Sequence, residues 1–146
     1  MILPRLQHTT APAATLLIRC MVGGVFLSEG IQKFLFAADV GAGRFAKIGI
    51  PSPEILAPMV GAFEIGCGVL VLLGLFTRLA VIPLLCIMAV AISTTKIPIL
   101  LASGFWKMAH EGRTDFSMVM GCLFLLLAGA GPWSVDAGRN RMKVGS

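Results

Sequence analysis

The sequence predicts an all-α integral membrane protein, namely a four-transmembrane-helix bundle with an interfacial segment between helices three and four. Composition is the first observation, because 57% of the 146 residues are hydrophobic, 13% are charged and the mean hydropathy is +0.91. A soluble domain carries about 25% charged residues, so this chain could not cover a water-facing surface. Apolar runs of about 17–25 residues, long enough to span a bilayer, are the second observation. They cover residues 13–36, 55–76, 79–95 and 116–133.

The type of apolar pattern is the third observation. Leu70–Phe76 and Leu123–Ala128 are unbroken apolar blocks, whereas the strands of a membrane β-barrel alternate apolar and polar residues. The barrel is therefore excluded. The four runs leave no room for a soluble domain, so residues 1–146 are expected to form a single membrane domain.

The first run has charges within an apolar helix. It contains Arg19, Glu29 and Lys33 and is longer than the core of about 7–15 residues in a signal peptide, so we expect it to be retained. At about 100° per residue, these charges share one stripe with Gly23 and Gly30. Small residues mark helix contacts in a bilayer and charges avoid lipid, so the stripe is expected to face the bundle interior.

The second run has Glu64 near its middle. A carboxylate at bilayer depth costs about 2.5–3.5 kcal/mol, so it is rarely found there without a partner or a function. Gly61 and Gly68 share its helical face and predict close packing. Because the first two helices are antiparallel, Glu29 and Glu64 are both expected about 10–14 Å from the same end of the bundle.

The third run ends with Lys96 at that end of the bundle, and Asp115 begins the fourth run there. Ionisable residues from all four helices are therefore expected to converge on one half of the bundle, while Arg19 is embedded in the other half. Glu64 and Glu29 are the candidate catalytic residues. The candidate ligand-binding residues are Lys33, Arg19, Lys96, Asp115 and Trp106.

Structural roles for these charges stay open as alternatives. Arg19 and Lys33 could extend to the lipid headgroups, and Lys96 and Asp115 could form a simple ion pair. Glu64 could form a bridge to Lys33 or Arg19 that locks the bundle.

The connection Ile97–Ala109 is too short for another span and is predicted to be interfacial or partly re-entrant. Its Phe105 and Trp106 are expected at the membrane surface above the charged half, either as an anchor or as a lid over a pocket. The first connection, Ala37–Glu54, is rich in glycine and proline and is predicted to be a loop that leads into helix two near Ser52.

Several kinds of site are excluded by residue type and spacing. The cysteines occur one per run without a CxxC pair, so no metal site is predicted and free thiols are expected; they are Cys20, Cys67, Cys86 and Cys122. His8 and His110 lie outside the runs, which argues against a haem held by two histidines. No basic stripe with interleaved aromatic residues exists, so no nucleic-acid partner is expected.

The basic residues favour cytoplasmic termini in a bacterial plasma membrane. Both sides of the predicted topology carry five basic residues, and the terminal side has Arg5, Arg78, Arg139, Arg141 and Lys143. The other side has Arg44, Lys47, Lys96, Lys107 and Arg113. The cluster 139–143 lies directly beside the last run, where the positive-inside bias is strongest.

Three stretches resemble the DoxX family of small membrane proteins. The spacing Arg19-x3-Gly23-x2-Phe26-x3-Gly30-x2-Lys33 resembles the family's first helix. The stretch Glu64-Ile-Gly-Cys-Gly-Val-Leu-Val-Leu-Leu-Gly-Leu-Phe-Thr-Arg78 looks like its second helix and turn, and Gly131-Pro-Trp-Ser-Val-Asp136 is similar to its exit from helix four. The chain departs from the family's pattern at two points. It has Asp115 where glutamate is commoner, and its exit motif after helix four is compact.

The resemblance implies a connection with redox chemistry. The family takes its name from a subunit linked to thiosulfate:quinone oxidoreduction, and relatives are associated with membrane complexes that handle thiols, quinones or oxidative stress. It implies an embedded polar set of Arg19, Glu29, Lys33 and Glu64. We therefore expect a subunit that binds quinone or anchors a redox protein partner, with self-association in the lipid bilayer as a further expectation. A small proton or anion transporter and a non-catalytic structural subunit are the alternatives.

Overall fold

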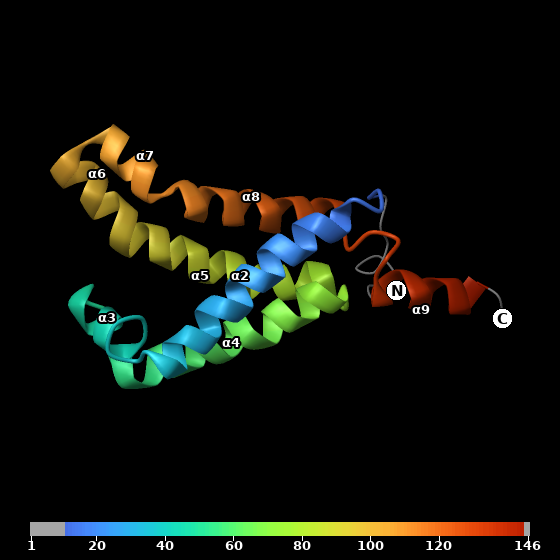
Figure 1. The fold of residues 1–146 in the computed structure, drawn as a ribbon, viewed down its shortest axis with the longest axis horizontal. Coiled ribbons are helices and arrows are strands. Elements are labelled where there is room, and N and C mark those ends of the chain that lie inside the picture. Colours follow the sequence, from blue (N-terminus) through green and yellow to red (C-terminus); the bar gives the residue numbers. More distant parts are fainter. Residues whose placement is uncertain (1–10, 145–146) are drawn as a thin grey trace.

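The computed structural model describes residues 11–144, with side chains for residues 11–139. Its regular structure is helical throughout this part of the chain (Figure 1). The elements are α2 (Thr15–Leu35), α3 (Ala42–Lys47), α4 (Pro53–Leu73), α5 (Thr77–Ala91), the π-helical turn η1 (Ile92–Lys96), α6 (Ile97–Ser103), α7 (Phe105–Glu111), α8 (Arg113–Ala128) and α9 (Val135–Val144). His8, Arg5 and the side chains of Arg141 and Lys143 lie outside the described residues.

Three helical segments in residues 11–144 are long and apolar enough to cross a membrane. They are α2, α4 and the continuous stretch Thr77–Ser103, which correspond to the first three predicted spans. The fourth predicted span, 116–133, is not confirmed, because α8 has only 16 residues where about 20 are needed. The helix ends at Ala128 because Gly129 and Gly131 adopt φ values of +86° and +82° ahead of Pro132, which breaks the helical path.

The third helix is longer than its predicted range of 79–95. It runs for 27 residues through η1 and α6, so the segment 97–109, which was predicted to be interfacial or partly re-entrant, begins as an extension of the third helix and continues into α7. Pro98 does not end this helix, because it lies in the first turn of α6 after the π-helical turn, a position where its missing N–H is tolerated. Gly104, with φ +81°, makes the turn into α7.

Glycines allow α2 and α4 to approach closely, as their predicted packing faces indicated. A Cβ atom on Gly30 would lie 2.7 Å from the carbonyl oxygen of Gly61, and one on Gly68 would lie 3.0 Å from that of Gly23. A side chain at these positions would therefore push the two backbones apart. The contact fixes the register in which Lys33 and Glu64 meet.

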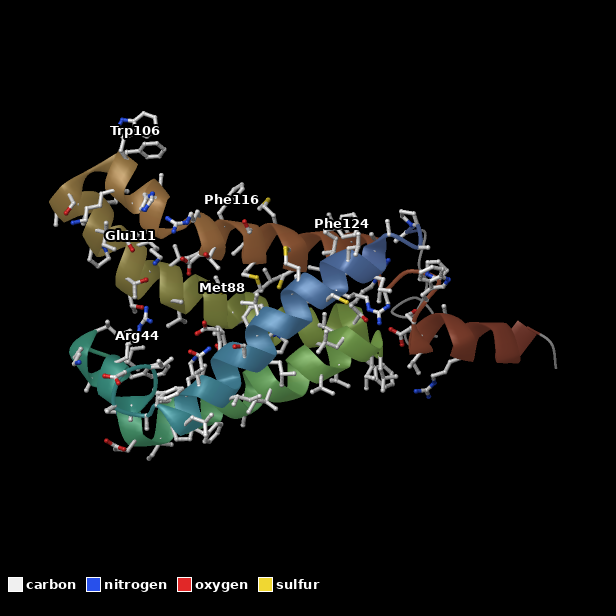
Figure 2. All side chains as sticks on the ribbon, viewed as in Figure 1. Arg44, Met88, Trp106, Glu111, Phe116 and Phe124 are labelled. Carbon is white, nitrogen blue, oxygen red and sulfur yellow. The ribbon has the colours of Figure 1, made fainter. Side chains whose placement is uncertain are left out.

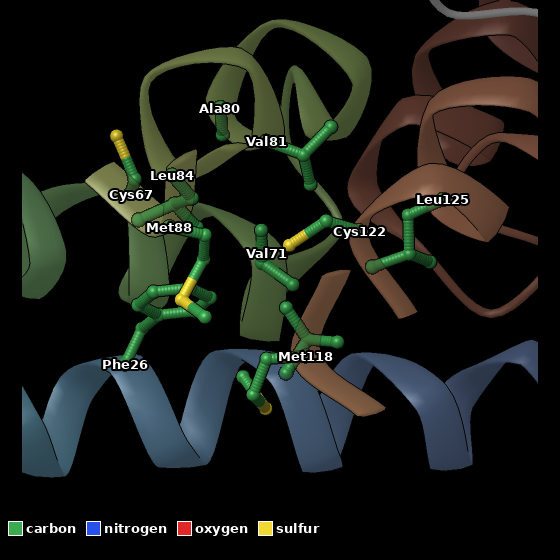
Figure 3. Packing of buried hydrophobic residues seen from close by; sticks show 11 residues of the cluster. Phe26, Cys67, Val71, Ala80, Val81, Leu84, Met88, Met118, Cys122 and Leu125 are labelled. Atoms are coloured by element: carbon green, nitrogen blue, oxygen red, sulfur yellow. The ribbon is translucent and has the colours of Figure 1, made fainter. Parts of the chain in front are cut away.

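A core formed by α2, α4, α5 and α8 fills the middle of the bundle (Figure 3). Its fully covered side chains include Val22, Val71, Val81, Leu84 and Leu125. In Figure 1, α2 runs beside α4 and α5 beside α8, and these two helix pairs diverge toward the end that carries α3, α6 and α7.

Candidate functional site

A cavity of about 590 Å³ lies between the two diverging helix pairs. Its wall is mostly apolar and includes Phe45 of α3 together with Phe26, Met88 and Met118, which also belong to the core. Seven acidic and basic side chains also line it, namely Glu29, Lys33, Arg44, Glu64, Lys96, Glu111 and Asp115. The predicted convergence of Glu29, Lys33, Glu64, Lys96 and Asp115 on one half of the bundle is confirmed.

Lys33 and Glu64 form a buried ion pair on one wall of the cavity. The Nζ atom of Lys33 lies 2.7 Å from Oε2 of Glu64, and the side chains are 9% and 5% exposed. Lys33 follows Gly30 by one turn and Glu64 follows Gly61 by one turn, so the close glycine contact brings the two side chains together. The predicted bridge between Glu64 and Lys33 is confirmed, and Lys33 does not extend to the headgroups.

Lys96 and Asp115 form a second ion pair on the opposite wall. Their Nζ and Oδ2 atoms lie 3.2 Å apart, and the side chains are 13% and 21% exposed. Lys96 ends η1 and Asp115 lies in the first turn of α8. The ion pair, which was the structural alternative for these two residues, is present, and it is less deeply buried than the first.

The π-helical turn η1 positions Lys96. Its hydroxyl residues donate to carbonyl oxygens one turn earlier: Ser93 to Ala89, Thr94 to Val90 and Thr95 to Ala91, at 2.7, 2.8 and 2.6 Å. Thr94 and Thr95 also line the cavity. Single π turns in α-helices occur frequently at functional sites. The run of three hydroxyl residues before Lys96 is the sequence signal that could have indicated this turn.

Three further charged residues line the cavity outside the two ion pairs. Glu29 lies one turn before Lys33 on α2 and is exposed in the cavity. Arg44 on α3 and Glu111 on α7 lie on opposite sides of the cavity (Figure 2). Arg44 and Glu111 were missed as site residues because both lie on short helices in the connections. Phe45, next to Arg44, is the buried residue of α3, and a single apolar residue in a glycine-rich connection is no sequence signal for a helix.

Arg19 lies at the other end of the bundle and does not line the cavity. It is 2% exposed, so it does not extend to the headgroups. Its guanidinium donates to four carbonyl oxygens, those of Val71 at 2.9 Å and Ala130 at 3.3 Å and those of Leu72 and Trp133. The carbonyls at a helix C-terminus lack partners within the helix, and a planar guanidinium with several N–H groups can satisfy them together. Arg19 and Lys33 therefore lie at opposite ends of the bundle and do not contribute to the same binding site.

Asp136 completes the closed end of the bundle. Its carboxylate accepts hydrogen bonds from the backbone N–H groups of Phe76 and Thr77, at 3.0 and 3.2 Å, and so caps the start of α5. Its own N–H donates to the carbonyl oxygen of Gly74 at 3.0 Å. Together with Arg19, Asp136 ties the segment after α8 to the turn between α4 and α5.

Trp106 also lies apart from the cavity. It is 84% exposed and is not among the residues that line the cavity. In Figure 2 it points away from the bundle, next to Phe105. This geometry does not support its predicted role as a lid or a ligand contact.

The four cysteines are free, as expected. Cys86 lines the cavity, whereas Cys67 and Cys122 are buried and Cys20 is exposed. Among residues 11–144 no group of three His, Cys, Asp or Glu side chains is placed to hold a metal ion.

Fold and site together define a small helical membrane protein with a charged cavity at one end. The DoxX family model matches residues 14–97, and the chain belongs to the DoxX family. It is 51% identical over 139 residues to an uncharacterized membrane protein of Mycobacterium tuberculosis, an alignment that covers 91% of this chain and 85% of that relative. No solved structure matches the chain. The resemblance found in the sequence and the membrane location are therefore confirmed.

Proposed function

We propose that the protein is a redox-associated subunit of a bacterial plasma membrane that binds a quinone in the cavity. The observation that carries this proposal is the pair of lysine–carboxylate contacts, Lys33–Glu64 and Lys96–Asp115, on opposite walls of a mostly apolar space. A quinone ring is apolar and has a carbonyl oxygen on either side. Each ion pair offers such an oxygen an ammonium donor and a neighbouring carboxylate.

Each charged residue has a distinct part in this proposal. Lys33 and Lys96 donate hydrogen bonds to the two quinone oxygens, since ammonium groups are donors only. Glu64, with Glu29 one turn before Lys33, handles the proton at the oxygen held by Lys33, and Asp115 handles the proton at the oxygen held by Lys96, because reduction of a quinone to a quinol adds two electrons and one proton at each oxygen. The electrons would come from a partner oxidoreductase docked on the membrane subunit. Arg19 is reassigned from ligand binding to holding the closed end of the bundle.

The proposed topology places the cavity at the outer side of the membrane. In this arrangement α8 and the segment after it form the fourth crossing of a single domain, and the termini are cytoplasmic. The basic residues Arg78 and Arg139 lie at the closed end with the described part of the C-terminal segment, which fits the positive-inside bias.

Binding is favoured over transport by the packing beyond the cavity. Between the cavity and the closed end, the interior is filled by core side chains such as Val22, Val71 and Leu84, each 0% exposed. A proton or anion pathway would need these side chains to separate. A purely structural subunit is the other alternative, and it predicts that changes in the cavity alter stability without altering any ligand.

Quinone binding is tested first on the protein extracted with its native lipids, by mass spectrometry of bound small molecules and co-purifying chains. A water-soluble short-chain quinone is then titrated into wild type, Glu64→Gln and Lys96→Met in lipid nanodiscs. Glu54→Gln is the matched control, because Glu54 is on the same helix as Glu64 but outside the cavity lining.

We expect binding to weaken about tenfold or more in the two cavity variants, which corresponds to about 1.4 kcal/mol per tenfold, and to be unchanged in Glu54→Gln. Equal affinity in all variants, or wild type that binds no quinone, would overturn the proposal. A melting temperature for each variant separates loss of binding from loss of fold.

A further inference from the structure

The hairpin formed by α6 and α7 has a large exposed apolar surface. None of its residues is buried, although the two helices pack against each other through the turn at Gly104. Its most exposed apolar side chains are Leu101 at 81%, Trp106 at 84% and Phe105 at 57%. A contiguous exposed apolar surface on a folded protein marks a contact with lipid or with another protein.

The position of the hairpin along the third spanning helix identifies the occupant. The continuous helix Thr77–Ser103 has 27 residues and is therefore about 40 Å long at 1.5 Å per residue. The hydrocarbon core of a bilayer is about 30 Å thick, so the helix extends into the headgroup region. Phe105 and Trp106 follow within three residues of its end, and Lys107 comes next. Tryptophan and lysine are side chains that favour the membrane–water interface.

Exposed apolar side chains also lie along the spanning helix that leads into the hairpin. Leu79, Ile82 and Ile97 are 53%, 45% and 46% exposed, and none of them lines the cavity. Lipid accounts for apolar exposure on a spanning helix, and the exposed apolar side chains of the hairpin follow on the same chain segment. A bilayer therefore covers this surface without a further partner.

Helix α7 has two sides with different surroundings. Trp106 points away from the bundle (Figure 2), and Phe105 forms an edge-to-face pair with it, with ring centroids 5.3 Å apart. Glu111, at the other end of α7, lines the cavity. One short helix thus contributes both to the outer surface of the protein and to the wall of the cavity.

We propose that Leu101, Phe105 and Trp106 form a lipid-contact surface at the level of the headgroups and the upper acyl chains. The α6–α7 hairpin is held at the interface by this surface, and Glu111 is thereby placed at the mouth of the cavity. A ligand dissolved in the bilayer then meets the mouth at headgroup level. This inference is independent of whether the ligand is a quinone.

The experiment uses the two tryptophans of the chain. Trp133→Phe leaves Trp106 as the only tryptophan, and the backbone carbonyl of residue 133 that accepts from Arg19 is retained. The full-length variant is reconstituted into vesicles of phosphatidylcholine brominated either near the glycerol end or near the end of the acyl chain. Trp106→Phe, which leaves Trp133 at the opposite end of the bundle, is the matched control for reconstitution.

We expect loss of most of the Trp106 emission with bromine near the glycerol end, a smaller loss with bromine near the chain end, and little quenching by aqueous iodide. Strong quenching by iodide without quenching by bromine would place Trp106 in water and overturn the proposal. Protection from both quenchers would mean that a second copy or another protein covers the hairpin, which would also overturn it.

Discussion

The two ends of the bundle use buried charges in different ways. At the closed end, Arg19 donates to four backbone carbonyls and Asp136 accepts from two backbone N–H groups. At the open end, the charges pair with other side chains, Lys33 with Glu64 and Lys96 with Asp115. Backbone partners at the closed end belong to α4, α5 and the segment after α8, so these bonds connect both helix pairs.

The ion pairs at the open end do not connect the two helix pairs. Lys33–Glu64 lies within the α2–α4 pair, and Lys96–Asp115 joins η1 to α8 within the other pair. Neither of these two contacts crosses the cavity. The closed end therefore fixes the angle between the helix pairs, while the open end keeps space for a ligand. The following substitutions separate these two roles.

The largest loss of stability is expected for Arg19→Leu. Hydrogen bonds to a charged group contribute about 1.5–3 kcal/mol each, and buried acceptors left without a donor add a further cost, so we expect a loss of about 3–5 kcal/mol without full additivity. Reversible unfolding in mixed detergent micelles measures this. Arg44→Leu is the control, since that side chain is exposed, and equal losses in both variants would contradict the comparison.

Lys33→Met is expected to cost about 3 kcal/mol, because it leaves Glu64 buried without its partner. The double variant Lys33→Met with Glu64→Gln removes both charges and should lose less than the sum of the single variants, by about 1–3 kcal/mol. A double-mutant cycle of unfolding free energies measures this coupling. Strict additivity would mean that the pair at 2.7 Å contributes little to holding α2 against α4.

Gly30→Ala is expected to cost about 1–3 kcal/mol through overpacking. Its Cβ atom would meet the carbonyl oxygen of Gly61 at 2.7 Å, and a backbone atom cannot rotate away. Gly24→Ala is the matched control, because a Cβ atom there meets nothing within 4 Å, and alanine favours the helix by up to about 1 kcal/mol. Thermal unfolding is expected to show a lower melting temperature for Gly30→Ala and a higher one for Gly24→Ala. A lower melting temperature in both variants would contradict the assigned contact face.

Helical periodicity was sufficient to predict much of the open end. The stripe with Gly30 and Lys33 and the face with Gly61 and Glu64 follow from about 3.6 residues per turn. The antiparallel arrangement of neighbouring helices then places both faces at one end. Lys33 and Glu64 meet because the periodicity of each helix already places its residue on the packing face. The pairing of α2 with α4 then only sets the register between the two faces.

The closed end could not be predicted in the same way. The partners of Arg19 are backbone carbonyls, and every residue has one, so no residue type marks them in the sequence. Arg44 and Glu111 lie on helices of six and seven residues, which are shorter than the window in which periodicity is informative. The polar residues 93–96 of the π turn interrupt the apolar pattern, so the third helix was expected to end near residue 95, although it continues to Ser103.

The smallest effect on stability is expected for Lys96→Met. Its pair with Asp115 is longer, at 3.2 Å, and its side chains are more exposed than those of Lys33 and Glu64, so solvent screens the interaction and we expect a loss of about 1 kcal/mol or less. Asp115→Asn should give a similar value, because it removes the same contact. Unfolding of both variants beside Lys33→Met measures the difference between the two walls of the cavity. A loss in Lys96→Met as large as that in Lys33→Met would mean that η1 and α8 depend on their ion pair as strongly as α2 and α4 do, and that both walls of the cavity are equally rigid.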